Sequence, residues 1–332
     1  MIDLSIVIVA WNSLDVLVPC LESIETAIHA REEGRLETET ILVDNGSEDG
    51  TVEGVRSRFP WVRCLPLPEN RGFAAGNNVG LREARGRHVV ALNSDTVVLP
   101  GGFERCVAYL DAHPDVGVVG PQLLNPDGSK QNSIHSPPSL WTEFLPIALL
   151  ETLFPARFPS KRRTHDRPID VPAILGAAMF VRREVLEEVG LMPEDYFFFL
   201  EETDWCTRIR AAGWRVVHVP DVTVVHLFGA SSKKKLPAAT RIEFQRSLDH
   251  FFRKHRGPVQ ARLVAVWRFL KSVFYVAVRA PAALVSARGR ERWKGDLHIL
   301  RWHLRGRPLE GFGFPRGTRI LGESAPRLRR DS

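Results

Sequence analysis

The chain has 332 residues, of which 44% are hydrophobic and 25% are charged, and its formal net charge is +6. This composition is ordinary for a globular protein and excludes a chain that is disordered throughout. The length allows one large domain or two smaller ones.

The charge is distributed unevenly along the chain. Residues 233–332 hold 24 Lys or Arg against 7 Asp or Glu, whereas residues 1–232 hold 21 against 32. A basic region behind an acidic body predicts an anionic partner, either a membrane surface or nucleic acid. A basic helical extension without such a partner is the alternative. We place a domain boundary near Ser232, between a domain at 1–232 and an extension at 233–332.

The cysteines and the N-terminal segment indicate the cellular compartment of the protein. The four cysteines are Cys20, Cys64, Cys106 and Cys206, without a C-x-x-C pair. This spacing argues against a zinc knot or a disulfide framework and favours a reducing compartment. The first residues lack a basic segment followed by an apolar one, so we expect no signal peptide and a cytoplasmic protein.

One apolar segment in the basic region bears on membrane association. Residues 263–287 are apolar but include Arg268, Lys271, Arg279 and Pro281. No stretch of the chain reaches the ~18–20 uninterrupted apolar residues of a spanning helix. The segment therefore predicts an interfacial or buried helix, and a peripheral position at the inner face of the cytoplasmic membrane.

Strand-like runs and helical patterns alternate four times over the first hundred residues. Residues 5–10 (SIVIVA) form a β-branched apolar run typical of a buried parallel strand, and a helical pattern follows at 14–31. Further strands are predicted at 40–43, 63–67 and 87–92, and further helices at 51–59 and 73–84. This alternation predicts an α/β domain with a mostly parallel sheet flanked by helices.

The pattern changes in the second part of the chain. Residues 120–172 are rich in proline and polar residues, which predicts loops. Beyond them we predict strands at 174–181, 215–219 and 223–225, a helical turn at 183–189 and a helix at 201–212. From residue 232 onward the pattern is helical and basic.

Polar clusters follow three of the predicted strands, at residues 11–13, 44–47 and 93–95. Ligands of open α/β sheets bind beyond the carboxyl ends of the strands. We therefore expect the binding site at this edge of the sheet.

Two aspartates stand at these strand ends. Asp95 ends HVVALNSD, and carboxylate oxygens bind Mg²⁺ or Mn²⁺, which in turn bridge a diphosphate. Asp44 is placed to accept a hydrogen bond from a ribose hydroxyl or a pyrimidine N–H. The alternative for both is a turn residue, because Asn-Ser-Asp-Thr and Asp-Asn-Gly are favourable turn sequences.

Two basic side chains are candidate partners of a phosphate or a metal. Arg71 precedes a helix of small residues, where it can reach a phosphate together with the helix N-terminus. His226 ends a short strand, and a neutral imidazole binds borderline metals. The alternatives are an ordinary loop-to-helix junction and a structural histidine.

Three carboxylates follow the aromatic run 196–199, at Glu201, Glu202 and Asp204. At helical spacing Glu201 and Asp204 share a face, whereas Glu202 points elsewhere. Burial against aromatic rings raises the pKa of a carboxyl group and suits it to accept a proton from a hydroxyl. The alternative is the ordinary preference of acidic residues for a helix N-terminus.

Seven sequence blocks occur in the order found in glycosyltransferase family 2. They are SIVIVAWN, ILVDNGSEDGT, NRGFAAGNNVGL, VVALNSDTVV, GAAMFVRREVLEEVG, FFFLEETDWCTRIRAAGW and VVHLFGAS. The chain resembles the rhamnosyltransferase-like branch, which acts in cell-surface polysaccharide assembly, over residues 4–232. The resemblance implies the GT-A fold of nucleotide-diphospho-sugar transferases and an inverting hexosyltransferase.

The resemblance also implies ligands. It points to a nucleoside-diphosphate sugar donor, a glycan or polyprenyl-linked acceptor, and a divalent cation, Mn²⁺ or Mg²⁺. Rhamnose is one candidate sugar. The implied donor-binding residues are Trp11, Asn12, Asp44, Arg71, Asn77, Asn93, Ser94, Asp95 and Gly176.

Individual roles follow from the matched motifs. Trp11 stands where the family has Tyr and is expected to stack on the base, and Asp44 matches the aspartate that contacts base or ribose. Asp95 is the implied metal ligand. His226 matches a histidine that completes the metal site in some members of the family, and Glu202 stands where the family usually has the catalytic Asp. Inversion implies a single in-line displacement at the anomeric carbon.

The chain departs from the family pattern at two positions. Asn93 replaces the first Asp of the D-x-D-like motif, so metal binding depends on Asp95 and His226. Glu202 replaces the usual Asp, so Glu201 and Asp204 remain candidates for the base.

Three other functions are less favoured. A nucleotidyltransferase would need a glycine-rich basic loop where this chain has Trp-Asn-Ser-Leu-Asp, and no G-x-G-x-x-G of a dehydrogenase is present. A non-catalytic relic of the fold that binds carbohydrate or nucleotide is the alternative that Asn93 and Glu202 suggest. Nucleic acid is an unlikely partner of the basic region, because no nucleic-acid-binding motif is evident.

Overall fold

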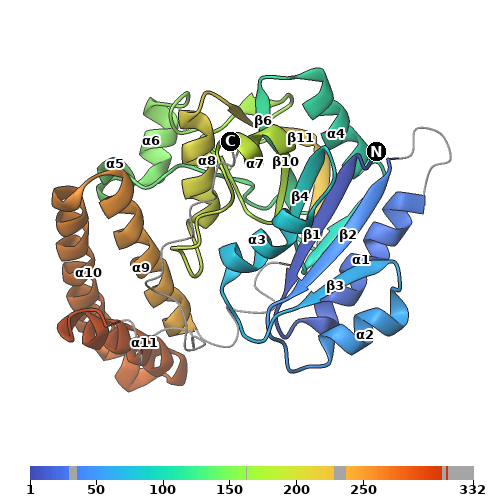
Figure 1. Cartoon of the computed structure of the whole chain (residues 1–332). Helices are drawn as coiled ribbons and strands as arrows, with labels where there is room; N and C mark the ends of the chain where they lie inside the picture. Colours follow the sequence, from blue (N-terminus) through green and yellow to red (C-terminus); the bar gives the residue numbers. More distant parts are fainter. Residues whose placement is uncertain (30–35, 162, 228–236, 309–311, 313–332) are drawn as a thin grey trace, which may run out of the picture.

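The structure is a computed structural model that describes residues 1–29, 36–161, 163–227, 237–308 and 312. A nine-stranded sheet forms its centre, flanked by helices (Figure 1). The strands of this sheet are β1 (Leu4–Ala10), β2 (Thr38–Asp44), β3 (Val62–Pro66), β4 (His88–Asn93), β5 (Thr96–Val98), β6 (Val116–Leu124), β8 (Ile169–Asp170), β10 (Ala178–Arg182) and β11 (Arg215–His226). A second, two-stranded sheet pairs β7 (Ile134–His135) with β9 (Ala173–Ile174).

The large sheet is mixed but mostly parallel, as predicted. Its order is β3-β2-β1-β4-β10-β6-β11-β5, and β8 pairs with β11. Strands β3, β2, β1 and β4 are parallel to one another, as are β6 and β11. Strand β10 runs antiparallel between β4 and β6, and β5 runs antiparallel along β11. The carboxyl ends of β1, β2 and β4 therefore meet at one edge.

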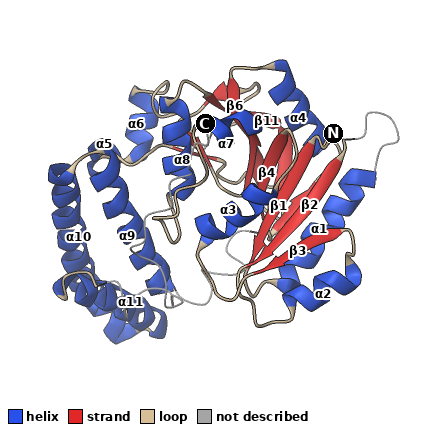
Figure 2. Ribbon diagram, viewed as in Figure 1, coloured by secondary structure: helices blue, strands red, loops and turns tan. Residues whose placement is uncertain are grey.

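Helices cover both faces of the sheet (Figure 2). The helices that precede residue 228 are α1 (Leu14–His29), α2 (Thr51–Arg58), α3 (Phe73–Glu83), α4 (Gly102–Ala112), α5 (Leu140–Phe144), α6 (Ile147–Leu153), α7 (Arg183–Glu188) and α8 (Glu201–Ala211). Strand β1 contributes to two hydrophobic cores, because Ile6 and Ile8 pack with α1 and Val7 packs with α3. Burial of both faces explains why the strand is apolar at nearly every position.

Glycines let α3 approach the sheet closely. A Cβ atom at Gly76 would lie 2.9 Å from Val9 Cγ1, and one at Gly80 would overlap the side chain of Val7. The small residues of this predicted helix therefore allow its backbone to pack closely against β1. This close packing places the loop that precedes α3 beside the strand ends.

The predicted elements of the first hundred residues are confirmed, with shifted boundaries. Further along, several elements differ from the prediction. The strand predicted at 174–181 is divided between β9 and β10, which belong to different sheets, and the segment predicted as loops contains β7 and β8. Strand β6 extends into the segment predicted as loops from residue 120, and that segment also contains α5 and α6. The two strands predicted at 215–219 and 223–225 are one strand, β11, whose pairing with β6 shifts register between Val219 and Thr223.

The described part of the C-terminal region is helical, as expected, with α9 (Pro237–His255), α10 (Pro258–Val285) and α11 (Ala287–Leu304). In Figure 1 these helices form a layer at the left of the molecule, with α9 nearest the body. Leu248 and Phe252 of α9 pack with Ala261 and Val264 of α10, and Leu200 of the first domain joins this cluster. Among the helices that the structure describes, none has the length and apolar content required to span a membrane.

Candidate active site

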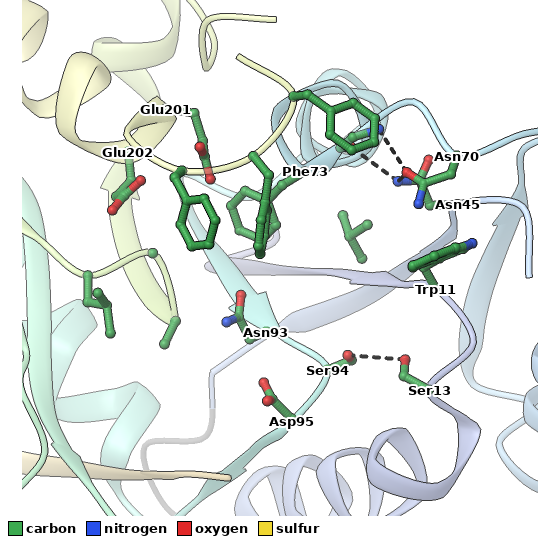
Figure 3. A pocket seen from close by; sticks show the side chains of 18 of the residues that line it. Trp11, Ser13, Asn45, Asn70, Phe73, Asn93, Ser94, Asp95, Glu201 and Glu202 are labelled. Carbon is green, nitrogen blue, oxygen red and sulfur yellow. Dashed lines mark hydrogen bonds between the residues drawn. The ribbon is translucent and has the colours of Figure 1, made fainter. Parts of the chain in front are cut away.

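A pocket opens at the carboxyl edge of the sheet, where the polar clusters predict it (Figure 3). Strands β1 and β4 form one side, the turn between β9 and β10 forms another, and the aromatic segment before α8 closes it. The lining residues are Val9, Trp11, Ser13, Asn45, Asn70, Gly72, Phe73, Asn93, Ser94, Asp95, Leu175, Gly176, Ala177, Phe197, Phe198, Phe199, Glu201, Glu202 and His226. Eight of the predicted site residues are thus brought together: Trp11, Asn93, Ser94, Asp95, Gly176, Glu201, Glu202 and His226.

Asn45 joins the end of β2 to the loop before α3. Its Nδ2 donates to Asn70 Oδ1 at 3.0 Å and to the Gly72 carbonyl at 3.1 Å, and its Oδ1 accepts from the Arg71 N–H at 3.0 Å. The partly exposed Trp11 lies across the pocket from the aromatic segment (Figure 3). Neither Asn45 nor Asn70 was predicted, although the polar cluster at 44–47 contains the former.

Gly72 brings two of the sequence blocks into contact. Its φ is +88°, and a Cβ atom there would lie 2.6 Å from the carbonyl oxygen of Phe197. The Phe73 N–H donates to that same carbonyl at 3.0 Å. Only glycine fits this left-handed, crowded position, and it ties the Asn-Arg-Gly-Phe loop to the aromatic wall of the pocket.

Asp95 and His226 face each other at the end of β4. Asp95 Oδ1 lies 3.2 Å from His226 Nε2, and Asn93 Nδ2 lies 3.4 Å from the same nitrogen. Asn93 Oδ1 is buried and has no hydrogen-bond partner among the described residues. Ser94 Oγ lies 3.3 Å from Ser13 Oγ, which holds the turn against the start of α1. Ser13 is a further pocket residue that was not predicted.

Gln131 fixes the orientation of the His226 ring. Its Nε2 donates to the His226 carbonyl at 3.0 Å and to Asn125 Oδ1 at 2.9 Å, so its Oε1 is the atom that faces the ring. An amide oxygen only accepts, and His226 Nδ1 therefore donates to it, at 2.7 Å. This bond directs Nε2 toward Asp95. No sequence pattern marked Gln131, which lies 95 residues from its partner.

These side chains fit a divalent cation that is shared with a substrate. The described residues contain no group of three or more His, Cys, Asp or Glu side chains that would hold a metal by itself. Asp95 and His226 offer a carboxylate and an imidazole, and the unpartnered Asn93 Oδ1 adds an amide oxygen. Mn²⁺ accepts this mixed set, and Mg²⁺ is commonly held by one or two carboxylates plus substrate phosphates.

Two buried carboxyl groups stand on the other side of the pocket, at the start of α8. Glu201 is 4% exposed and Glu202 is 8% exposed. Burial raises the pKa of Glu202 to about 7, and burial together with the charge of Glu202 raises the pKa of Glu201. Gly176 lies beside them, where a Cβ atom would be in ordinary van der Waals contact with Glu202 Cβ, at 3.6 Å. A carboxyl group with such a pKa suits proton transfer near neutral pH.

The turn into α8 is strained and is held from outside. Phe199 and Leu200 have φ values of +72° and +68°, which cost non-glycine residues about 1–3 kcal/mol each. Ser247 of α9 donates to the Phe198 carbonyl at 2.8 Å, and Phe244 of α9 packs edge-on against Phe199. The C-terminal region therefore contacts the segment that presents the two glutamates.

Asp204 is buried outside the pocket. Its carboxylate accepts from the Tyr196 hydroxyl at 3.0 Å, from Arg208 Nε at 3.1 Å, from Lys254 Nζ at 3.1 Å and from His255 Nε2 at 2.7 Å. Although burial raises its pKa, the hydrogen bonds from His255 and Lys254 outweigh burial and lower it. Asp204 thus joins α8 to α9. Although Glu201 and Asp204 were expected to share a face of the helix, only Glu201 of the two lines the pocket.

Asn12 and Asp44 lie beside the pocket rather than in its lining. Asn12 Oδ1 accepts from the Glu48 N–H at 2.8 Å, and its own N–H donates to Ser47 Oγ at 2.9 Å. Asp44 Oδ2 accepts from the Ser47 N–H at 3.2 Å, whereas its buried Oδ1 has no partner within the described chain. Asp44 thus retains one acceptor for a ligand.

Arg71 and Asn77 also stand outside the lining. The Arg71 side chain is 40% exposed and lies 4.0 Å from the Glu194 carboxylate. Asn77 is buried within α3, where its Nδ2 donates to the Phe73 carbonyl at 3.0 Å. In this arrangement Asn77 stabilises the start of α3, and Arg71 lies at the surface near the pocket rim.

Comparison of solved structures agrees with this architecture. A mannosyltransferase from Pyrobaculum calidifontis, solved with GDP-Man and Mn²⁺, superposes with a TM-score of 0.54 at 19% identity, over 91% of this chain and 86% of that one. GalNAc-T7, solved with UDP, GalNAc and Mn²⁺, gives a TM-score of 0.52 at 18% identity, over 76% and 50%. These similarities confirm the GT-A fold.

Sequence relatives include two rhamnosyltransferases. The N-acetylglucosaminyl-diphospho-decaprenol L-rhamnosyltransferase of Mycobacterium tuberculosis is 32% identical over 202 residues, which are 56% of this chain and 65% of that protein. The dTDP-rhamnosyl transferase RfbF of Shigella flexneri is 23% identical over 201 residues, 58% and 61%. The matched regions span less than two thirds of either relative. The family model described as glycosyl transferase family 2 matches residues 5–190, and the chain therefore belongs to glycosyl transferase family 2.

Proposed function

We propose that the protein is an inverting, metal-dependent glycosyltransferase that transfers a sugar from a nucleoside diphosphate to a glycan or lipid-linked acceptor. The observation that carries the proposal is one pocket with two chemically different sides (Figure 3). Asp95 and His226 form the side suited to a cation and a diphosphate, and the buried Glu202 forms the side suited to proton transfer.

The donor side is formed by the strand ends. Trp11 offers a ring for stacking on the base, and Asp44 Oδ1 offers a hydrogen-bond acceptor for base or ribose. Asp95 and His226, with Asn93 Oδ1, would hold the divalent cation. When bound, that cation neutralises charge on the diphosphate and so stabilises it as a leaving group. Rhamnose is the favoured sugar, since two relatives are named for its transfer.

The acceptor side is formed by the start of α8. Glu202 takes the proton of an acceptor hydroxyl while that oxygen attacks the anomeric carbon. The new carbon–oxygen bond forms as the bond to the diphosphate oxygen breaks on the opposite face, which inverts the anomeric centre. Glu201 is the second candidate for the base, because it is also buried in the pocket and its pKa is also raised.

The acceptor is proposed to be a lipid-linked sugar in cell-surface polysaccharide synthesis. The mycobacterial relative is named for a decaprenol-linked acceptor. An aromatic wall of Phe197, Phe198 and Phe199 lines the acceptor side, and sugars bind favourably on such rings. A lipid-linked acceptor would place the reaction at the inner face of the cytoplasmic membrane.

Donor binding and stereochemistry together test this proposal. Thermal unfolding with UDP-, dTDP- and GDP-sugars, with and without Mn²⁺, should show a metal-dependent rise in melting temperature with one class of donor. NMR of the product should show the anomeric configuration opposite to that of the donor. A stabilising donor that the protein never turns over with any acceptor would favour the non-catalytic relic instead.

A further inference from the structure

Helix α10 presents an apolar face that no other described element covers. Six of its side chains are between 50% and 69% exposed: Val259, Leu263, Val266, Leu270, Phe274 and Val278. At 100° per residue they occupy a sector of about 120° of the helix circumference. Ala261 and Val264, on the opposite side, are buried against α9. The exposed face is therefore the outer surface of the C-terminal layer.

The apolar face continues onto α5. The Trp267 ring lies 5.2 Å from the ring of Phe144, which is itself exposed, and Trp267 Nε1 donates to the Glu143 carbonyl at 3.1 Å. Arg268 pairs with the Glu143 carboxylate beneath them, with two hydrogen bonds of 2.9 Å. These contacts fix α5 beside α10, so the exposed Phe144 ring extends the apolar face.

The charge around this face is positive. Helices α10 and α11 together contain nine Lys or Arg and two Asp or Glu. One of the two acids, Asp296, is buried and paired with Arg241 and Arg279, so it adds no negative charge to the surface. Exposed Arg288, Arg290 and Arg292 follow directly at the start of α11. Exposed apolar residues bordered by basic ones match an anionic lipid surface.

A second copy of the chain fits this face less well. The spacing of Val259, Leu263, Val266 and Leu270 alternates four and three, as in a coiled coil. The flanking positions, however, hold Trp267 and Phe274 on one side, with Arg262 and Phe269 on the other, and not the charged pairs that specify a helical partner. The apolar sector is thus wider than a coiled-coil seam, and a lipid layer accommodates that width.

We propose that the outer face of α10, extended by Phe144, inserts into the interfacial region of an anionic bilayer. Helix α9 connects this surface to the pocket, because it packs on α10 through Leu248 and Phe252 and holds the aromatic segment through Ser247. Binding in this way would attach to the lipid surface the helical layer that contacts the acceptor side of the pocket, on the surface where a lipid-linked acceptor resides. That last consequence rests on the proposed lipid-linked acceptor, whereas membrane binding itself does not.

Vesicle flotation with the full-length chain tests the surface directly. The wild type should float with vesicles of phosphatidylglycerol and phosphatidylcholine, and less with phosphatidylcholine alone. The triple substitution Leu263→Glu, Val266→Glu and Leu270→Glu should reduce the floated fraction roughly tenfold or more, because the glutamates add charge to the inserted face. All three side chains are exposed, so the fold should be retained, as circular dichroism would verify.

A matched control introduces the same charge elsewhere. Ser57→Glu, Leu99→Glu and Ala112→Glu change three exposed positions of the first domain and should float like the wild type. Equal flotation of the α10 variant and the wild type, or no flotation of the wild type, would overturn the proposal. So would a wild-type dimer in light scattering that the α10 substitutions convert to a monomer. Flotation uses no sugar nucleotide, so it remains decisive whether or not the protein transfers sugar.

Discussion

Asp95 Oδ1 lies 3.2 Å from His226 Nε2, although the two residues are 131 positions apart. Strand β11 runs antiparallel to β5, which pairs His226 with Thr96, and the Leu227 N–H donates to the Asp95 carbonyl at 2.8 Å. Backbone pairing therefore fixes the separation of the two side chains. The cation proposed between donor and protein would use this preformed pair.

Asp95→Ala should abolish most metal binding while leaving the fold intact. It removes the one carboxylate at the cation side of the pocket, and we expect a loss in transfer rate of about 10²-fold or more. Asn93→Ala should cost less, because it removes a neutral ligand. Titration calorimetry with Mn²⁺ in the presence of nucleoside diphosphate measures both variants, and equal Mn²⁺ affinity in Asp95→Ala and wild type would contradict the assignment.

Gln131→Ala should weaken Mn²⁺ binding without touching the metal itself. The variant releases His226 Nδ1, so the ring is no longer held with Nε2 toward Asp95. Loss of such a supporting bond typically lowers metal affinity by about 10–100-fold. Gln131→Glu keeps an acceptor for Nδ1 and should restore part of the affinity. If the Ala variant binds Mn²⁺ like the wild type, the ring does not depend on Gln131.

The rate of transfer should decline toward acidic pH, with an apparent pKa near 7. The base must be unprotonated to accept a proton, and burial raises the pKa of Glu202 to about 7. Glu202→Gln should lower kcat/KM by about 10²–10⁴-fold and remove this acidic limb. Measuring kcat/KM as a function of pH for the wild type and Glu202→Gln tests this assignment. If the decline toward acidic pH is unchanged in the variant, Glu201 and not Glu202 is the base.

The contribution of Glu202 to folding stability should fall as the pH rises from 5 to 8, opposite in sign to that of His135, His218 and His303, whose pKa burial lowers to about 4. The folded-state pKa of Glu202 lies above its unfolded value of 4.5, so the folded chain binds the extra proton between these values and loses that advantage above pH 7. The shift to about 7 corresponds to about 3 kcal/mol. Glu202→Gln should therefore raise the free energy of unfolding at pH 8 and change it little at pH 5. Urea unfolding at both pH values measures these free energies. Equal stabilisation of the variant at pH 5 and pH 8 would show that the Glu202 charge in the folded protein is not the cause.

Much of the fold was predictable because the strands of the first hundred residues are apolar on both faces. Strand β6 was not predicted, since Gly117, Gly120 and Pro121 interrupt its apolar run. Its neighbours explain the interruption, because a Cβ at Gly120 would lie 2.7 Å from Ile174 Cγ2. Glycine is required at such positions because a segment that is distant in sequence packs closely against them. The periodicity of apolar residues along the chain does not reveal this packing.

The site was predictable in its motifs but not in its supporting contacts. Helical spacing paired Glu201 with Asp204, yet the pocket lies at the N-terminus of α8 and takes Glu201 and Glu202. The position of Asp204 depends on His255 and Lys254 of α9, and that of His226 depends on Gln131. These partners are remote in sequence and carry no motif, so only the folded chain brings them together.

Release of nucleoside diphosphate tests directly whether Asp95 and Glu202 carry out metal-dependent sugar transfer. The full-length protein is mixed with UDP-, dTDP- or GDP-sugar, Mn²⁺ and a sugar-diphospho-lipid acceptor, and the wild type is compared with Glu202→Gln and Asp95→Ala. We expect metal-dependent release by the wild type, with transfer of the sugar to the acceptor, and little release by either variant. Release that is equal in all three proteins, or absent with every donor, would contradict the proposed glycosyl transfer.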